Sequence, residues 1–359
     1  IHGTNFEPLD ITKITAKDLG IVETDKYDYI MTYSFPCQDL SLAGKGAGMK
    51  KGSGTRSGLL WEVERLLKEC KELPQILLME NVPQVINKKH FKDFREWQLF
   101  LEKLGYSNYF KLLNAKDYGI PQNRNRCFMV SLLGDYYYEF PRKQKLKYRL
   151  KDFLEDEVDE KYYLSDKMLK SLTDVTNRNE FVRADKFRPI NPLKQSISYT
   201  LTGSPGNRPS DNFIKDNIGL SPTFKTTSDD IGVVVKGNYS PSGHNASRIV
   251  DINGIAPTVM ENHGTVTAIA VKKEICNISK LKQFYKNIYI DEFNRAFIKV
   301  GNMFYRIRKV TPKECWRLMG FSDEDFDKAE KVNSNSQLYK QAGNSIVVQV
   351  LEAVFKEFF

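Results

Sequence analysis

A regular alternation of strand-like and helix-like patterns over the first 135 residues constrains the fold more than any other feature. Three short apolar runs that end in turn residues read as strands, at 27–35, 75–82 and 126–133. Between them, 58–73 and 94–106 carry apolar residues at three- and four-residue spacing, which is typical of helices. This order predicts a mostly parallel sheet covered by helices on both faces, with ligands bound outside the carboxyl ends of the strands.

Two of the predicted strands end in residues that can carry chemistry. The first is followed by Pro36 and Cys37, and the second ends in Glu80 and Asn81. Because the carboxyl ends of parallel strands meet at one edge of a sheet, we expect Cys37 and Glu80 to line the same crevice. Taken alone, Cys37 also fits a small buried hydrophobe, and Glu80 also fits a helix cap.

Two arginines precede the third predicted strand, in the stretch "YGIPQNRNRCFMV". Arg124 and Arg126 are alternate residues, so they point to the same face if the segment is extended. Neighbouring arginines lower the pKa of a cysteine thiol and so favour its nucleophilic form. The alternative is an exposed sheet edge with solvated charges.

Composition limits the class of protein. A net charge of +9 over 359 residues suits a polyanionic partner, although many soluble proteins are basic. The chain has no apolar run of about 18 residues and no signal peptide, so we expect a cytoplasmic protein that does not enter membranes. The five cysteines are widely spaced and form no C-x-x-C pair, which argues against disulfides and a metal site.

The pattern changes after the third predicted strand. Short β-rich pieces appear among Gly, Pro, Ser and Asn, and loops of this kind commonly carry recognition. Further on, the stretch 311–321 opens like a capped helix, and 344–359 reads as an amphipathic helix. We therefore expect an α/β domain formed by 1–145 and 333–359, and a smaller β-rich domain at 146–332.

The order of the motifs resembles the cytosine-C5 DNA methyltransferase family. Along the chain come Pro-Cys-Gln, Glu-Asn-Val, Gln-x-Arg-x-Arg, "TPKECWRLMGF" and "QAGNS", and only 141–240 is a weak match. The stretches "TYSFPCQDLS", "TRSGLLWEVERLL" and "LLMENV" especially resemble the mollicute CpG-methylating branch. The resemblance implies a Rossmann-like methyltransferase domain and a target-recognition domain. It also implies methyl transfer from S-adenosylmethionine to carbon 5 of a flipped-out cytosine in a specific duplex DNA sequence.

The resemblance also assigns catalytic roles that make chemical sense. The Cys37 thiolate would add to carbon 6 of the ring, which activates carbon 5 as an enamine. Glu80 would contact N3 and the exocyclic amine, and burial should raise the pKa of this carboxyl so that it keeps a proton. Arg126 would hold the base O2, Arg124 would support the cysteine and the adjacent phosphate, and Asn81 would buttress the strand ends.

The cofactor residues follow from the same resemblance. They are Asp10 and Ile11 at the adenine, Phe35, Leu59, Asn344 and Ser345. The Phe35 carbonyl would also contact the exocyclic amine of the cytosine. The family's Phe-x-Gly-x-Gly turn, which cradles methionine, is absent from this chain. We therefore expect these residues to bind cofactor poorly without a preceding segment or a second chain.

DNA contacts are expected first from the glycine-rich stretch 42–56, which fits a mobile loop closing over DNA, although a disordered surface loop is the alternative. The resemblance places Gln38 and Ser41 at the DNA gap and phosphates, and Lys45 and Arg56 are basic residues of the loop. The stretch "GIAPTVMENHGT" resembles the target-recognition signature and makes Thr258 a contact, although Val259 replaces the family's Leu.

The expected partner is double-stranded DNA, with a restriction endonuclease of the same bacterial or phage system as a further candidate, and a monomer is expected. Two alternatives stay open. An RNA cytosine-C5 methyltransferase would use the same chemistry, but such proteins typically lack a long recognition region. An inactive, sequence-specific DNA-binding homologue is the other. A cysteine hydrolase is disfavoured because no histidine lies in a motif that indicates a partner for Cys37.

Overall fold

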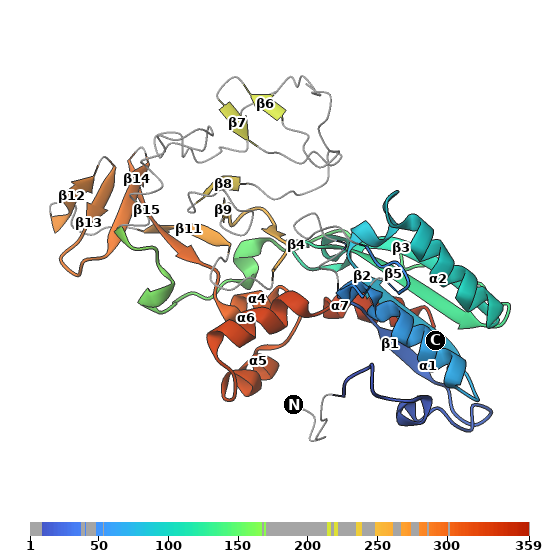
Figure 1. Ribbon diagram of the computed structural model, residues 1–359. Helices are drawn as coiled ribbons and strands as arrows, with labels where there is room; N and C mark the ends of the chain where they lie inside the picture. Colours follow the sequence, from blue (N-terminus) through green and yellow to red (C-terminus); the bar gives the residue numbers. More distant parts are fainter. Residues whose placement is uncertain are drawn as a thin grey trace. The chain divides into compact units, whose positions relative to one another are not determined.

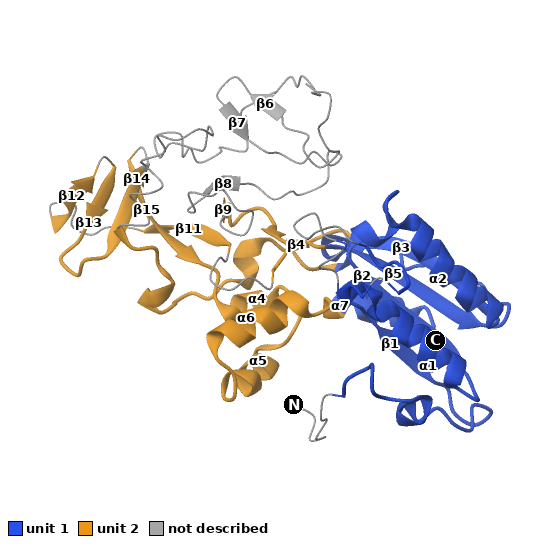
Figure 2. Cartoon of the chain, in the orientation of Figure 1, with its two compact units in different colours: residues 1–118, 125–144, 349–359 blue, residues 119–124, 145–348 orange. Residues whose placement is uncertain are grey.

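Figure 1 shows the computed structural model, and Figure 2 colours the two compact units into which the chain divides. The first comprises residues 1–118, 125–144 and 349–359, and the second comprises 119–124 and 145–348. The residues that the structure describes are 9–36, 40, 48–52, 54–166, 169, 214–216, 219–221, 235–238, 248–260, 267–273, 280–285, 287–300 and 302–358. Residues 333–348 fall in the second unit. The catalytic and recognition roles expected for the two parts remain predictions.

A four-stranded sheet forms the centre of the first unit, in the order β1-β2-β5-β3 (Figure 1). Its strands are β1 (Ile30–Tyr33), β2 (Ile76–Asn81), β3 (Tyr106–Asn114) and β5 (Asn125–Leu133). β1 and β2 are parallel, whereas β5 is antiparallel to both β2 and β3. In its described part the sheet is therefore mixed, and the expectation of a mostly parallel sheet is wrong. The cause is β3, which the sequence analysis missed and which forms a hairpin with β5.

The two helices predicted in this unit are present, with slightly different ends. α1 covers Leu60–Glu69 and follows a short 3-10 helix, Arg56–Leu59. α2 covers Phe91–Lys103, and the chain turns after it through Gly105, whose φ of 96° favours glycine. Further 3-10 turns cover Ala16–Leu19, Pro83–Ile86 and Ala115–Tyr118.

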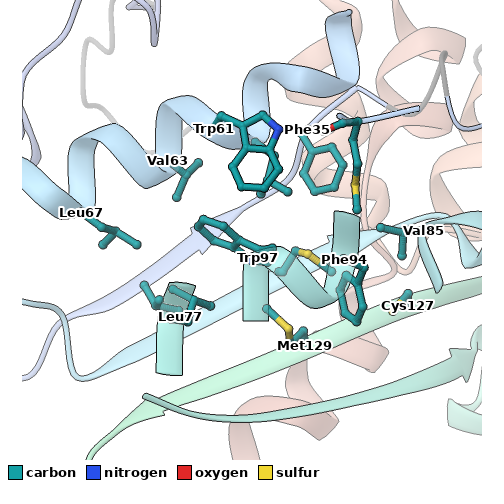
Figure 3. Packing of buried hydrophobic residues seen from close by; sticks show 14 of the residues in the cluster. Phe35, Trp61, Val63, Leu67, Leu77, Val85, Phe94, Trp97, Cys127 and Met129 are labelled. Carbon is teal, nitrogen blue, oxygen red and sulfur yellow. Dashed lines mark hydrogen bonds between the residues drawn. The ribbon is translucent and has the colours of Figure 1, made fainter. Parts of the chain in front are cut away.

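The core of the first unit packs both helices against the sheet, and two tryptophans lie at its centre (Figure 3). Trp61 of α1 and Trp97 of α2 meet edge to face, with ring centroids 6.3 Å apart. Each indole nitrogen has a partner: Trp61 Nε1 donates to the Met49 carbonyl at 2.7 Å, and Trp97 Nε1 donates to the Tyr33 hydroxyl at 2.9 Å. The packing therefore fixes the last residue of β1.

A seven-stranded sheet dominates the second unit, in the order β12-β13-β14-β15-β11-β9-β8. Its strands are β8 (Val235–Asn238), β9 (Arg248–Val250), β11 (Ala268–Lys273), β12 (Lys282–Tyr285), β13 (Ile288–Ile290), β14 (Ala296–Val300) and β15 (Met303–Lys309). Only the pairing of β9 with β11 is parallel within this sheet. Two smaller pairs are β4 (Gln122–Asn123) with β10 (Ala256–Pro257), and β6 (Ile214–Asp216) with β7 (Gly219–Ser221).

Helices follow this sheet in the chain. They are α4 (Pro312–Arg317), α5 (Asp323–Glu330), α6 (Asn335–Asn344) and α7 (Val348–Lys356), of which α7 lies almost wholly in the first unit. The predicted start of α4 is confirmed: the Thr311 hydroxyl accepts a hydrogen bond from Glu314 N at 3.1 Å, and the Glu314 carboxylate accepts one from Thr311 N at 2.8 Å. The predicted C-terminal helix is also confirmed, with Val350 and Val354 buried.

Candidate active site

Glu80 and Arg126 form an ion pair within the first unit. Arg126 Nε lies 3.1 Å from Glu80 Oε1. The register of β2 and β5 explains the contact, because Glu80 lies opposite Phe128 and Arg126 is the diagonal neighbour two residues away. Glu80 is only 8% exposed, so its carboxylate has lost most of its water and relies on this guanidinium. The alternative of a solvated sheet edge is wrong for Arg126.

Asn81 fixes the end of β2 to the segment that follows β1. Its side-chain Nδ2 donates to the Phe35 carbonyl at 2.9 Å, and its Oδ1 accepts from Val82 N at 2.8 Å. The next carbonyl along, that of Pro36, accepts a hydrogen bond from the buried hydroxyl of Ser57 at 2.6 Å. The backbone is thus held at the two residues before Cys37.

Ser57 was not among the predicted site residues, although it lies in the stretch "TRSGLLW", which resembles the family. The only sequence signal is a small polar residue at the start of a helix. Cys37, Gln38, Ser41 and Lys45 lie outside the described residues. Arg56 is described and exposed, one residue before Ser57.

Arg124 has a different environment from Arg126. The division between the units passes between Arg124 and Asn125, and the Arg124 side chain belongs to the second unit. Its guanidinium donates to three backbone carbonyls, those of Val259 at 2.9 Å, Gly343 at 2.9 Å and Ser345 at 2.8 Å. Arg124 is only 4% exposed, so the solvated-edge alternative is wrong here too. In this structure Arg124 therefore connects the segment around Val259 to the end of α6.

Gln122 joins the same elements more deeply in the second unit. Its fully buried side-chain amide donates to the Leu318 carbonyl at 2.6 Å and accepts from Val259 N at 3.0 Å. One residue further, the Asn123 carbonyl accepts a hydrogen bond from the Thr258 hydroxyl at 2.7 Å. Thr258, expected at the DNA, therefore holds its own segment against β4.

The described cofactor candidates are spread over both units. In the first unit, the Asp10 carboxylate accepts hydrogen bonds from Thr12, which lower the Asp10 pKa. Ile11 and Leu59 are half-buried. Arg65 of α1 donates to the Ile11 carbonyl at 2.9 Å, so this segment is bound to the helix that begins after Leu59. Asn344 ends α6 and Ser345 caps it, in the second unit.

None of the described thiols is activated as a nucleophile. Burial raises the pKa of Cys70 and of Cys315, and burial together with the Glu80 carboxylate raises the pKa of Cys127 to about 12. These cysteines stay protonated near neutral pH, which makes them poor nucleophiles. Over the same described ranges, no group of three or more His, Cys, Asp or Glu side chains is placed to hold a metal ion. Nor does that part of the chain contain a helix with the length and apolarity to cross a membrane.

Solved structures with a similar fold are methyltransferases. The Entamoeba histolytica methyltransferase EhMeth matches with a TM-score of 0.57 and 17% identity, covering 99% of this chain and 84% of its own. The S. pombe Dnmt2 methyltransferase matches with a TM-score of 0.56, at 17% identity and the same coverage. These likenesses define the class of the protein by fold: it has a methyltransferase fold.

The particular family follows from sequence comparison. A model of the C-5 cytosine-specific DNA methylases matches residues 1–359, and the chain belongs to this family. The type II methyltransferase M2.ScrFI of Lactococcus lactis subsp. cremoris is 34% identical over 98% of this chain and 70% of its own length. The orphan methyltransferase M.SPRI of Bacillus phage SPR is 32% identical over 97% of this chain and 85% of its own.

The resemblance to a mollicute enzyme is confirmed as well. The orphan methyltransferase M.SssI of Spiroplasma monobiae is 43% identical over 175 residues, which are 48% of this chain and 43% of that protein. The activity expected from the motifs, methylation of cytosine at carbon 5 in DNA, is thus confirmed by the family.

Proposed function

We propose that this protein methylates cytosine within a specific duplex DNA sequence through a covalent bond between Cys37 and carbon 6 of the base. The observation that supports it most concerns the two residues that precede Cys37 in the first unit. Asn81 and Ser57 hold the carbonyls of the two residues before the cysteine, and Glu80 at the end of the neighbouring strand is paired with Arg126. A nucleophile that follows an ordered backbone loses little entropy when it attacks.

The residues divide the chemistry in the following way. The Cys37 sulfur forms a bond to carbon 6, and the electron pair of the C5–C6 double bond is displaced toward C4 and N3. Glu80 contacts N3 and the exocyclic amine, where it stabilises the nitrogen that gains this charge. Arg126 faces the base O2 and keeps Glu80 oriented, since its Nε lies at the carboxylate. After methyl transfer, loss of the carbon 5 proton and of the sulfur restores the ring.

S-adenosylmethionine is the methyl donor that this chemistry needs, and it supplies an electrophilic methyl group when bound. Ile11 and Leu59 fit it in part, because both are half-buried apolar residues: Leu59 precedes α1, and the Ile11 carbonyl is bound by Arg65 of that helix. Asn344 and Ser345, at the end of α6, are the further candidates, and Arg124 holds the Ser345 backbone. The Phe35 carbonyl accepts a hydrogen bond from Asn81 in this structure and has a second lone pair for the exocyclic amine of the base.

The second unit is proposed to recognise the DNA target. Its seven-stranded sheet and connecting loops form a β-rich module, and Thr258 lies on a short segment bound to β4. Contacts from such a module would repay the cost of turning the target base out of the helix. Type II and phage orphan methyltransferases are both among the relatives, so we infer a role in a restriction-modification or phage system, acting as a monomer on DNA in the cytoplasm.

Covalent trapping on duplex DNA that contains 5-fluorocytosine tests the proposal, because fluorine at carbon 5 cannot leave as the proton does. With S-adenosylmethionine, the full-length protein should form a complex that survives denaturing electrophoresis. Cys37→Ser should abolish the complex and keep DNA binding, whereas the matched control Cys127→Ser should still form it. A covalent complex formed by Cys37→Ser would exclude Cys37 as the nucleophile. Methyl transfer to tRNA but not to duplex DNA would favour an RNA methyltransferase.

A further inference from the structure

A basic segment of the second unit lies outside the site described above. Residues 145–151 read "KLKYRLK" and carry Lys145, Lys147, Arg149 and Lys151 at alternate positions, with the first acid at Asp152. The three lysines are exposed and Arg149 is half-buried. Within the described part of the chain, no carboxylate forms an ion pair with any of these lysines, so their charge is available to a ligand.

The segment is anchored rather than loose. The Leu150 side chain is buried, and Leu150 N donates to the Gly254 carbonyl at 3.0 Å. Lys151 N donates to the Ile252 carbonyl at 2.9 Å. Arg149 N donates to the Asp152 carboxylate at 2.7 Å. Lys151 therefore projects from a backbone that is already bound, and Lys145 and Lys147 precede this anchored end by a few residues, which lowers the entropy that a bound partner must overcome.

The anchor connects the basic segment to the recognition signature. Ile252 and Gly254 belong to the turn that leads directly into β10 and Thr258, all within the second unit. Tyr148 lies among the lysines, 52% exposed, with its ring against Phe153 at a centroid distance of 5.9 Å. The segment thus presents positive charges and an aromatic face beside the residues expected to meet DNA.

We propose that Lys145, Lys147 and Lys151 contact phosphates of duplex DNA next to the target sequence, without reading its bases. The inference rests on the proposed function, since it takes DNA as the polyanion. An exposed lysine is a compact charge on a flexible stem, which suits a phosphate oxygen, and phosphate contacts fix the register of a protein on the duplex. Each such contact releases counterions, which makes binding depend on salt.

Salt dependence measures the number of these contacts. The slope of log K against log salt falls by about 0.9 for each phosphate neutralised on duplex DNA. Loss of three contacts should therefore make the slope about 2 to 3 less steep. The affinity of the variant would fall for a target duplex and for a scrambled duplex of the same length alike.

The experiment compares the full-length protein with the triple variant Lys145→Gln, Lys147→Gln, Lys151→Gln on both duplexes over a range of salt concentrations. A second triple variant, Lys17→Gln, Lys103→Gln, Lys331→Gln, removes the same charge from exposed positions elsewhere and should keep the original slope. An unchanged slope in the first variant, or a change on the target duplex only, would overturn the inference and leave the proposed function standing. If the unmodified protein shows no salt-dependent binding to duplex DNA, the proposed function fails with it.

Discussion

Glu80 and Arg126 meet diagonally across the antiparallel strands β2 and β5, with Nε of the arginine 3.1 Å from Oε1 of the glutamate. The contact couples the two residues that are expected to hold neighbouring atoms on one edge of the cytosine, N3 with the exocyclic amine and O2. Each side chain therefore orients the other before a base binds, and a substitution of one residue also changes the position of the other side chain.

Replacement of this carboxyl should slow the chemistry. Glu80→Gln removes the group that exchanges a proton at N3, so we expect single-turnover methyl transfer to duplex DNA to fall by about 10² to 10⁴-fold. DNA affinity should change far less. Glu102→Gln is the matched control, because Glu102 also pairs with an arginine, Arg95, at 2.7 Å but with both side chains exposed on α2. A full rate with Glu80→Gln would remove Glu80 from the mechanism.

Gln122 should be needed for stability of the second unit. In Gln122→Leu, the Leu318 carbonyl and Val259 N–H lose their partner in a buried place. Each unsatisfied group costs roughly 1 to 3 kcal/mol, so we expect the free energy of unfolding to fall by about 2 kcal/mol or more in a urea titration. Gln144→Leu, at an exposed glutamine, is the control and should have little effect. Equal stability of the two variants would show that water replaces the lost amide.

The buried ion pair between Arg308 and Glu314 should be sensitive to loss of one partner. Its atoms form two contacts, Nη2 to Oε1 at 2.6 Å and Nη1 to Oε2 at 2.8 Å, and both residues are buried. Glu314→Gln leaves the guanidinium without a counter-charge and should cost about 3 to 5 kcal/mol of unfolding free energy. Adding Arg308→Met should recover part of this loss, which a double-mutant cycle measures. Strict additivity of the two changes would argue against a coupled pair.

His90 should make the first unit less stable in mild acid. Burial, helped by Lys89, holds the pKa of this imidazole below its ordinary value of 6.5. The folded state therefore keeps His90 neutral while the unfolded chain takes up a proton, so stability is full above pH 6.5 and falls as the pH drops toward the folded-state pKa. His90→Gln should flatten the decline between about pH 7 and 5 in urea titrations. If the stability of His90→Gln falls with pH as steeply as that of the unmodified protein, other titrating groups cause the loss.

The sequence predicted the local elements better than their pairing. The runs at 27–35 and 75–82 contain β1 and β2, and the run at 126–133 covers β5 except its first residue, Asn125. Their apolar character was a sufficient signal. β3 was missed because its exposed and buried residues do not alternate, so the two-residue period is weak. Without β3 the third predicted strand was read as parallel, and the hairpin that reverses its direction was not foreseen.

The site was predictable to a similar extent. Strand ends predicted that Glu80 and Asn81 would matter, and spacing alone paired Arg124 with Arg126. The two arginines have different partners because β5 begins at Asn125, while Gln122 and Asn123 pair with Ala256 and Pro257, far along the chain. No local pattern encodes such a distant partner. The joint action of the two arginines on one base stays a prediction. The roles of the cofactor residues came from resemblance, not from periodicity.

The chain passes between its two units at four places, after residues 118, 124, 144 and 348. One consequence concerns the exchange of target specificity between relatives. A chimaera that grafts only residues 145–348 onto another member would leave the donor's 119–124 behind, and with them the β4 strand on which its Pro257–Val259 segment is registered. Residues 119–124 must therefore be transferred together with 145–348. Because the second unit consists of two separate chain segments, exchange of one contiguous segment does not transfer it intact.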